Sequence, residues 1–232
     1  MLIYLANFAL YQLQTTVLQN LRLRYLNHPY LISWLGGLLI LVYLISELFE
    51  KETGRIDSSV YSLMLKIRTP ELNQVMIWIS NMGEKGGLAA LAFLIIILIW
   101  QKHTKVALIA LASFSGSIAV LYTLKNILAR PRPELVNRLM AETSYSFPSG
   151  HSTIAFTVYP MILLTLLHFE TKPLRVNKNL VPIKIFLIIF PFLVAFSRLY
   201  LGVHYFSDVL AGGLIGLFFV SLYNLLISKV KS

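Results

Sequence analysis

Residues 147–169 read FPSGHSTIAFTVYPMILLTLLHF: a turn containing Pro148 and Gly150, then His151, then a long apolar run. A helix needs about 20 mostly apolar residues to cross the hydrocarbon core of a membrane. Proline and glycine interrupt regular backbone structure, so this run has a defined start. An ionisable histidine at the mouth of a membrane helix is costly and usually serves a function. The stretch therefore predicts a transmembrane helix with a functional site at its first turn.

Similar apolar runs recur along the chain and predict a membrane protein. Of the 232 residues, 57% are hydrophobic and 13% are charged, which is too little charge to cover a soluble domain. The fold class is predicted to be all-α, a polytopic membrane protein with six transmembrane helices and an N-terminal amphipathic helix. The six expected spans are 30–49, 86–101, 106–127, 152–169, 184–200 and 206–228.

The chain is divided into two predicted parts. Residues 29–232 are expected to form one six-helix membrane domain. Residues 1–28 mix apolar residues with Gln, Asn, Arg22 and Arg24, a composition that favours an amphipathic helix lying on the membrane surface. An additional span in this segment is the alternative.

The net charge of +10 is explained by the membrane rather than by nucleic acid, because membrane proteins concentrate Lys and Arg in cytoplasmic loops. Six spans place both termini in the cytoplasm, together with 10 of the 20 Lys and Arg residues. The outer side holds the other 10, but Lys125, Arg132 and Arg198 among them have a chemical reason to be there. We therefore expect a multi-pass protein of the plasma (inner) membrane, with the bilayer as its partner and its oligomeric state open.

Three polar segments are predicted to meet at the outer face: residues 125–133, 148–151 and 197–208. Each follows or precedes a span that ends on that side. Taken singly, each has an ordinary explanation: interfacial anchoring of basic side chains, a helix cap, or a local His–Asp surface pair. Their convergence on one face at membrane depth instead predicts a site.

The residue types in these segments suit an anion. Lys125, Arg132 and Arg198 supply three positive charges, and guanidinium groups match the geometry of phosphate oxygens. Unpaired N–H groups at a helix start attract anions, and glycine lets the backbone approach closely. The predicted phosphate-binding residues are Lys125, Arg132, Ser149, Gly150 and Arg198.

Two histidines divide the predicted catalytic work. His204 has the carboxylate of Asp208 four residues away, which would hold one ring nitrogen as N–H and leave the other to attack phosphorus. His151 has no such partner in its own segment and suits a general acid that protonates the leaving oxygen. The set predicts phosphoryl transfer through a phosphohistidine. No acidic cluster suited to Mg²⁺ or Zn²⁺ is visible, so no metal and no other cofactor is expected.

These segments resemble the type 2 phosphatidic acid phosphatase (PAP2) superfamily, whose pattern is K-x6-R-P, then P-S-G-H, then S-R-x5-H-x3-D. The first motif matches Lys125, Arg132 and Pro133, the second matches residues 148–151, and the third matches Ser197, Arg198, His204 and Asp208. The likeness extends over about residues 57–228, with a lead-in of Asp57, Arg68-Thr-Pro70 and Gly83.

The resemblance implies a six-span fold and metal-independent hydrolysis of lipid phosphates or pyrophosphates near the outer membrane surface. It also implies the roles given above for His204, Asp208 and His151. Bacterial members act on undecaprenyl pyrophosphate, phosphatidylglycerol phosphate, phosphatidic acid or lipid A 1-phosphate, and the sequence does not choose among them.

Other functions fit the same residues. A lipid phosphotransferase would pass the phosphoryl group to a lipid instead of water, a vanadate haloperoxidase shares the anion pocket, and a lipid carrier or scaffold would hold a relict site. Beside the site, Arg130 and Arg138 are either ordinary loop charges or attract anionic headgroups. Glu84 and Lys85 are weaker candidates for gating substrate entry.

Overall fold

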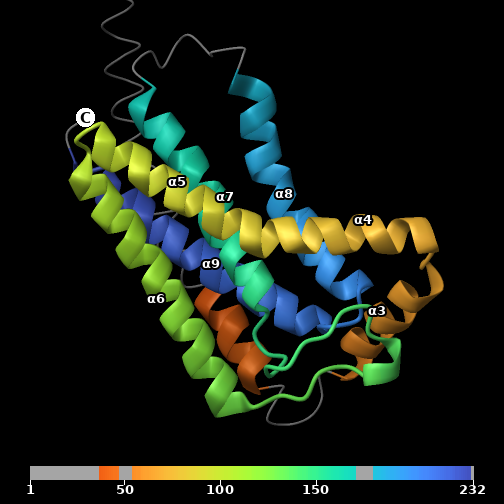
Figure 1. The fold of residues 1–232 in the computed structure, drawn as a ribbon. Helices are drawn as coiled ribbons and strands as arrows, with labels where there is room; N and C mark the ends of the chain where they lie inside the picture. The colour runs from red at the N-terminus through yellow and green to blue at the C-terminus, as the bar shows by residue number, and fades with distance from the viewer. Residues whose placement is uncertain (1–36, 47–53, 171–179, 231–232) are drawn as a thin grey trace, which may run out of the picture. The chain divides into compact units, whose positions relative to one another are not determined.

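The computed structural model describes residues 37–46, 54–170 and 180–230, and every regular element in these ranges is a helix (Figure 1). The all-α prediction is therefore confirmed. A short apolar helix covers Gly37–Ser46. The other elements are α3 Gly54–Lys66, α4 Pro70–Asn81, η1 Met82–Gly86, α5 Gly87–Trp100, α6 Thr104–Leu128, η2 Leu135–Asn137, α7 Gly150–Phe169, α8 Val181–Tyr200 and α9 Phe206–Ile227.

Five described helical stretches are long and apolar enough to cross a membrane. The helices α6, α7, α8 and α9 coincide with the last four expected spans to within three residues at either end. Of the first expected span, 30–49, the structure describes only residues 37–46. The predicted surface helix at 1–28 lies outside the described residues.

The second expected span is longer than predicted, because the helix that contains it begins at Pro70 rather than at residue 86 and runs to Trp100. Thr69 caps its start by accepting a hydrogen bond from the Leu72 amide, and Pro70 occupies the first turn, where its missing N–H costs nothing. A π-helical segment, η1, joins α4 to α5 and carries Glu84 into the middle of the rod. Such segments interrupt α-helices frequently at functional sites.

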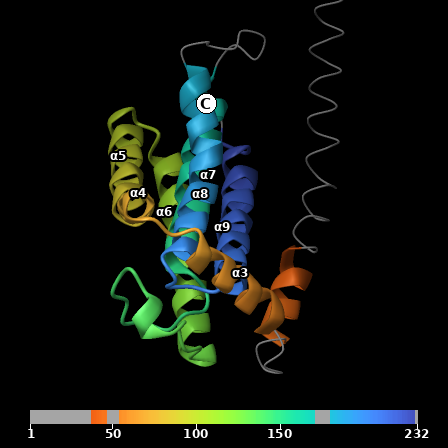
Figure 2. The same ribbon diagram turned by 90° about the vertical axis from the view of Figure 1, so that its right-hand side faces the viewer.

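Helix α7 is the centre of the described bundle, since it packs against α5, α6, α8 and α9. Figure 2 shows it between α5 and α6 on one side and α9 on the other. Its threonines are buried because their hydroxyls donate to carbonyls one turn earlier, as Thr153 does to Ser149 and Thr157 to Thr153. This local bonding lets polar residues occupy an apolar core.

The turn between α8 and α9 is fixed by Gly202, whose φ of +71° is left-handed. A Cβ there would lie 2.5 Å from Arg68 Nη2 and 2.9 Å from the Asn137 carbonyl oxygen. Glycine is therefore required both by conformation and by space. The tight turn sets the position of His204, two residues later.

Candidate active site

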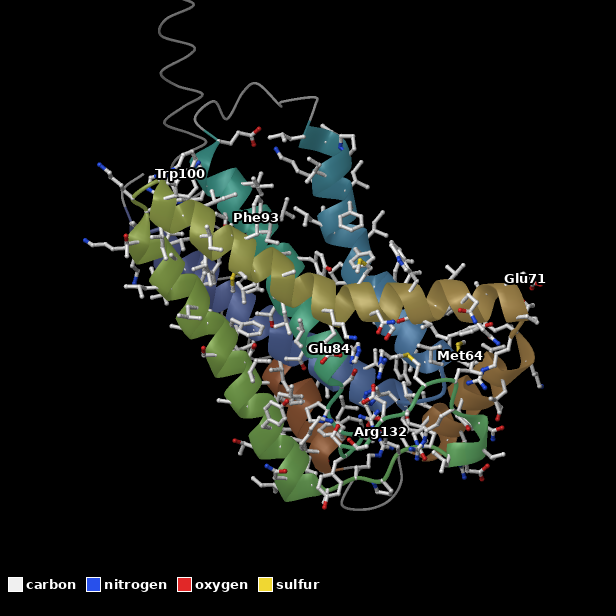
Figure 3. All side chains as sticks on the ribbon, viewed as in Figure 1. Met64, Glu71, Glu84, Phe93, Trp100 and Arg132 are labelled. Atoms are coloured by element: carbon white, nitrogen blue, oxygen red, sulfur yellow. The ribbon has the colours of Figure 1, made fainter. Side chains whose placement is uncertain are left out.

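Four helix ends and one loop build the site: the end of α6, the loop 129–149, the start of α7, the end of α8 and the start of α9. Backbone hydrogen bonds join them, from Ser149 N to the Asp208 carbonyl (2.9 Å) and from Leu139 N to the Leu201 carbonyl (3.0 Å). In Figure 3, nitrogen and oxygen atoms gather around the labelled Arg132, whereas Phe93 and Trp100 lie away from them. The three motifs, separate in sequence, thus reach one place.

His204 and Asp208 form a pair, although not as two residues of one helix. His204 precedes the helix, and Asp208 lies in the first turn of α9, where its Oδ2 accepts the N–H of Tyr205 at 2.8 Å. The same Oδ2 lies 3.4 Å from Nδ1 of His204 and accepts the Ser146 hydroxyl at 2.5 Å. Asp208 therefore caps the helix and orients the histidine with one carboxylate.

The protonation state of His204 follows from its other neighbour. Nη1 of Arg132 lies 3.1 Å from Nε2 of His204, and a guanidinium can only donate. Nε2 must then carry a lone pair while Nδ1 carries the proton toward Asp208. Burial, together with the charges of Arg132 and Arg198, lowers the pKa of His204 well below its ordinary value, although Asp208 opposes the shift. The ring is neutral at neutral pH, as a nucleophile requires.

Arg132 and Arg198 converge on a single carboxylate, that of Glu142. Nη2 of Arg198 donates to Oε1, and Nη2 of Arg132 lies 3.3 Å from Oε2. Burial raises the pKa of Glu142, but the two guanidinium charges outweigh it and hold the pKa below its ordinary value. Two oxygens of one anion thus bridge two arginines, an arrangement that a phosphate group would reproduce.

Arg198 retains unused capacity for an anion. Its side chain is 0% exposed, and its Nε has no hydrogen-bond partner among the described residues. A buried guanidinium N–H without an acceptor is costly. Burial, with the charge of Arg198, lowers the pKa of Arg132 to about 10 despite the opposing effect of Glu142. Both arginines are cations at neutral pH, and a further anion would stabilise them.

The remaining predicted phosphate-binding residues lie around this cluster. Nζ of Lys125, at the end of α6, donates to the carbonyl of Tyr145 in the loop. The Ser149 hydroxyl is the N-cap of α7 and accepts from Ser152 N at 3.4 Å. The Ser149 amide already donates to Asp208, so only the amides of Gly150 and His151 remain as first-turn donors. Two backbone donors at the start of α7 are therefore left for an anion.

His151 has a partner that its own segment did not supply. Oε2 of Glu84, in η1, lies 2.8 Å from Nε2 of His151. Figure 3 labels Glu84 on the rod formed by α4 and α5, which brings the carboxylate to the start of α7. The π-helical segment is the element that makes this contact. Sequence had marked Glu84 only as a weak gating candidate.

The reading of Arg130 as an ordinary loop charge is wrong. It donates to Asp208 Oδ1 at 2.5 Å and to Asp57 Oδ2 at 2.7 Å, and its guanidinium lies 4.3 Å from the centre of the Tyr205 ring. Arg138, by contrast, donates to the Pro133 carbonyl within the same loop. Sequence reasoning missed Glu142 altogether, because it lies in an irregular loop and belongs to no motif.

Comparisons with known proteins agree with this geometry. The model of the PAP2 superfamily matches residues 105–231. Phosphatidylglycerophosphatase B of Bacillus subtilis is 34% identical over 177 residues, which cover 75% of this chain and 85% of that protein. Undecaprenyl-diphosphatase of Sulfolobus acidocaldarius is 28% identical over 189 residues, 77% and 84% of the two chains.

Two solved structures are similar as well. The crystal structure of a transmembrane PAP2-type phosphatidylglycerolphosphate phosphatase from Bacillus subtilis matches with a TM-score of 0.75 and 30% identity, covering 85% of this chain and 97% of that one. Aquifex aeolicus LpxE matches with a TM-score of 0.56 and 25% identity, covering 72% and 93%. The predicted enzyme class, a hydrolase of lipid phosphates, is confirmed by the family and by these phosphatase relatives. The chain belongs to the PAP2 superfamily.

Proposed function

We propose that this protein removes a terminal phosphate from a membrane lipid without a metal ion, through a phosphohistidine on His204. One observation carries the proposal: His204 is held between Asp208 at Nδ1 and Arg132 at Nε2, and Arg132 shares an anion with Arg198. The potential nucleophile and the anion site are therefore adjacent.

The first half of the reaction transfers the phosphoryl group to the protein. A substrate phosphate binds Arg132 and Arg198 in place of Glu142, and Nε2 of His204 attacks phosphorus. The bond to the lipid oxygen breaks, and that oxygen takes a proton from His151. Asp208 stabilises the positive charge that develops on His204.

The second half returns the enzyme to its starting state. His151, now neutral, removes a proton from water, and the resulting oxygen attacks the phosphorus of the phosphohistidine. The N–P bond breaks, inorganic phosphate is released and His204 recovers its lone pair. Glu84 supports this cycle, because its carboxylate stabilises the protonated form of His151.

Fixed cations take the place of a metal in this proposal. Phosphoryl transfer is catalysed chiefly by positioning and by stabilising charge on the phosphoryl oxygens. Lys125, Arg132 and Arg198 together offer three charges around one position, and the amides of Gly150 and His151 add the start of α7. No further acid catalyst is required.

The proposed substrate is a lipid bearing a phosphate monoester or a pyrophosphate. Relatives named as acting on phosphatidylglycerophosphate and on undecaprenyl diphosphate support this class. The site lies at the ends of apolar helices, so acyl or isoprenoid chains can remain in the bilayer while the headgroup reaches the arginines. A lipid acceptor in place of water would give the phosphotransferase alternative.

The test is acid-quench trapping with ³²P-labelled phosphatidic acid and purified protein in detergent with EDTA. We expect label on histidine in the wild type, none in His204→Ala, and a loss of about 10⁴-fold in turnover for Asp208→Asn, by analogy with other His–Asp pairs. Product analysis with an added lipid alcohol separates hydrolysis from phosphotransfer. Label on serine, or turnover that requires Mg²⁺, would contradict the proposed mechanism.

A further inference from the structure

We infer that Arg130 and Asp57 form a positioning pair that orients Asp208 and sets the basicity of His204. This inference rests on the proposed function, in which His204 is the nucleophile and Asp208 its partner. Neither Arg130 nor Asp57 belongs to the three motifs. Both act on the reaction through Asp208 and do not touch the phosphate.

The contacts form a continuous chain from α3 to the nucleophile. Asp57, in the first turn of α3, lies 2.7 Å from Nη2 of Arg130 through its Oδ2. Nη1 of Arg130 lies 2.5 Å from Oδ1 of Asp208. Oδ2 of Asp208 faces Nδ1 of His204. Each end of the Arg130 fork thus holds a different carboxylate.

Ser207, in the first turn of α9, ties Asp57 to that helix. Its amide donates to Asp57 Oδ1 at 2.9 Å, and its hydroxyl donates to Asp57 Oδ2 at 2.7 Å. Nη1 of Arg130 also donates to the Ser207 hydroxyl at 2.7 Å. Asp57 therefore holds Ser207, the residue next to Asp208, both by direct hydrogen bonds and through Arg130.

The groups are shielded from water, which makes their mutual electrostatics strong. The exposed fraction is 3% for Asp57, 14% for Arg130 and 0% for Asp208. Burial alone lowers the pKa of Arg130, but the charges of Asp208 and Asp57 outweigh it and hold the pKa above its ordinary value. A permanently charged guanidinium between two carboxylates is the result.

The arrangement divides the two oxygens of Asp208. Among the described residues, the side-chain donors to Oδ1 come from Arg130, whereas Ser146, the Tyr205 amide and His204 face Oδ2. Arg130 thereby fixes the carboxylate plane and offsets part of its charge. The negative charge of Asp57 in turn offsets part of the Arg130 charge, so Arg130 neutralises the Asp208 charge less completely. The charged groups that act on His204 are then Asp208, Arg132 and Arg198, with Arg130 and Asp57 behind Asp208.

Removing the charge of Arg130 and removing the charge of Asp57 should shift the acidic limb of the pH profile in opposite directions. Loss of the Arg130 charge makes protonated His204 more favourable, so the acidic limb of the kcat/KM profile should move to higher pH. Loss of the Asp57 charge makes protonated His204 less favourable, so the acidic limb of the kcat/KM profile should move to lower pH. Each shift should be about half a pH unit or more for charges in a partly buried cluster. A merely structural role would not give shifts of opposite sign.

The experiment measures pH profiles of kcat and KM for short-chain phosphatidic acid with Arg130→Gln, Arg130→Lys and Asp57→Asn. We expect Arg130→Gln to lower kcat by at least about tenfold while KM stays within about twofold, because positioning and not binding is disturbed. Arg130→Lys keeps the charge and should retain the wild-type limb with a smaller loss of kcat. The matched control is Arg138→Gln, an arginine of the same loop that does not contact Asp208.

Phosphohistidine trapping in the wild type separates this inference from the proposed function. Suppose that wild-type His204 carries the phosphohistidine label, but the acidic limbs of the Arg130→Gln and Asp57→Asn profiles stay in place or move in the same direction. That result overturns only the positioning pair and leaves the proposed function intact. If Arg130→Gln does not fold, Arg130→Lys and Asp57→Asn decide by the same criterion: an unmoved limb in Asp57→Asn overturns the inference.

Discussion

Glu142 occupies the place where the proposed substrate would bind. Its two oxygens contact the guanidinium groups of Arg132 and Arg198, and its exposed fraction is only 18%. Glu142 thus provides an internal anion for two buried cations, which avoids the cost of leaving them unpaired. A phosphate must displace this carboxylate, so Glu142 and the ligand compete.

Removing the Glu142 charge should strengthen the binding of phosphate analogues. If Glu142 occupies the arginines most of the time, Glu142→Gln should lower the inhibition constant of tungstate by about tenfold, because the competent fraction rises. The measurement is inhibition of phosphatidic acid hydrolysis, with Glu134→Gln in the same loop as control. Weaker tungstate inhibition in Glu142→Gln would mean that the carboxylate organises the arginines rather than competing for them.

The pH dependence of the reaction follows from His204. Burial and two nearby arginines hold the pKa of this imidazole well below 6.5, so the neutral nucleophile persists as pH falls through the ordinary histidine range. The acidic limb of kcat/KM should therefore lie below pH 6.5 in the wild type, with activity lost only as the ring finally protonates. A profile of initial rates from pH 4 to 8 checks this, and a limb at or above 6.5 would contradict it.

Candidate site residues could be predicted where they belong to a spaced motif, but the residues that contact them could not. The spacing in K-x6-R-P and S-R-x5-H-x3-D predicted Arg132 and His204 as members of one site, and in the structure their side chains lie 3.1 Å apart. Glu142 gave no comparable signal, and Asp57 stood out only in the lead-in of the family resemblance, since a single carboxylate in a loop or at a helix start is ordinary in sequence. Their roles depend on long-range contacts such as Asp57–Ser207, which span 150 positions.

At the scale of elements, helix α9 packs closely on α7 through glycines. A Cβ at Gly212 would lie 2.5 Å from the Ser149 carbonyl oxygen, and one at Gly216 would lie 2.8 Å from Cβ of Phe156. Small residues four apart are a common means of close helix packing in membranes. This contact holds the start of α7 against Asp208, so packing of the two helices sets the geometry of the site.

Two neighbouring glycines offer a matched test of that packing. Gly212→Ala should lower stability by about 1–3 kcal/mol through overpacking and should reduce kcat, because Ser149 is pushed away. Gly213→Ala meets Phe156 only at 3.5 Å and should leave activity and stability near the wild type. Thermal unfolding and phosphatase assays in detergent measure both. Equal behaviour of the two variants would contradict the proposed role of the close contact.

The elements themselves were predictable where one uninterrupted apolar run formed one helix, as in α6 and α9. The second span was not, because Glu84 and Lys85 interrupt the apolar run and suggest a boundary. In the structure a π-helical segment carries these charges through the rod, so α4 and α5 continue as one stretch from Pro70 to Trp100. A hydropathy profile identifies apolar segments, but it does not recognise a polar residue within such a segment whose side chain faces a site.

At the scale of the whole molecule, the alternation of the spans places the candidate chemistry on one side of the membrane. Helix α6 ends, α7 begins, α8 ends and α9 begins at the site, while the turn from α5 to α6 and the end of α9 belong to the opposite side. The basic residues of that opposite side include Lys102, Lys105 and Lys229. Positive charge favours the cytoplasm, so we propose that the site faces the periplasm or the outside.

Sidedness is tested with single cysteines, since the chain contains none. Val136 lies in the loop beside the site with an exposed fraction of 85%, and Ser228 is exposed just beyond α9. A membrane-impermeant maleimide applied to intact spheroplasts should label Val136→Cys and should reach Ser228→Cys only after permeabilisation. The reverse pattern would place the site in the cytoplasm, where the lipid phosphates of the inner leaflet would become its substrates. Because the membrane barrier alone distinguishes the two positions, equal labelling in the permeabilised sample is the control for intrinsic reactivity.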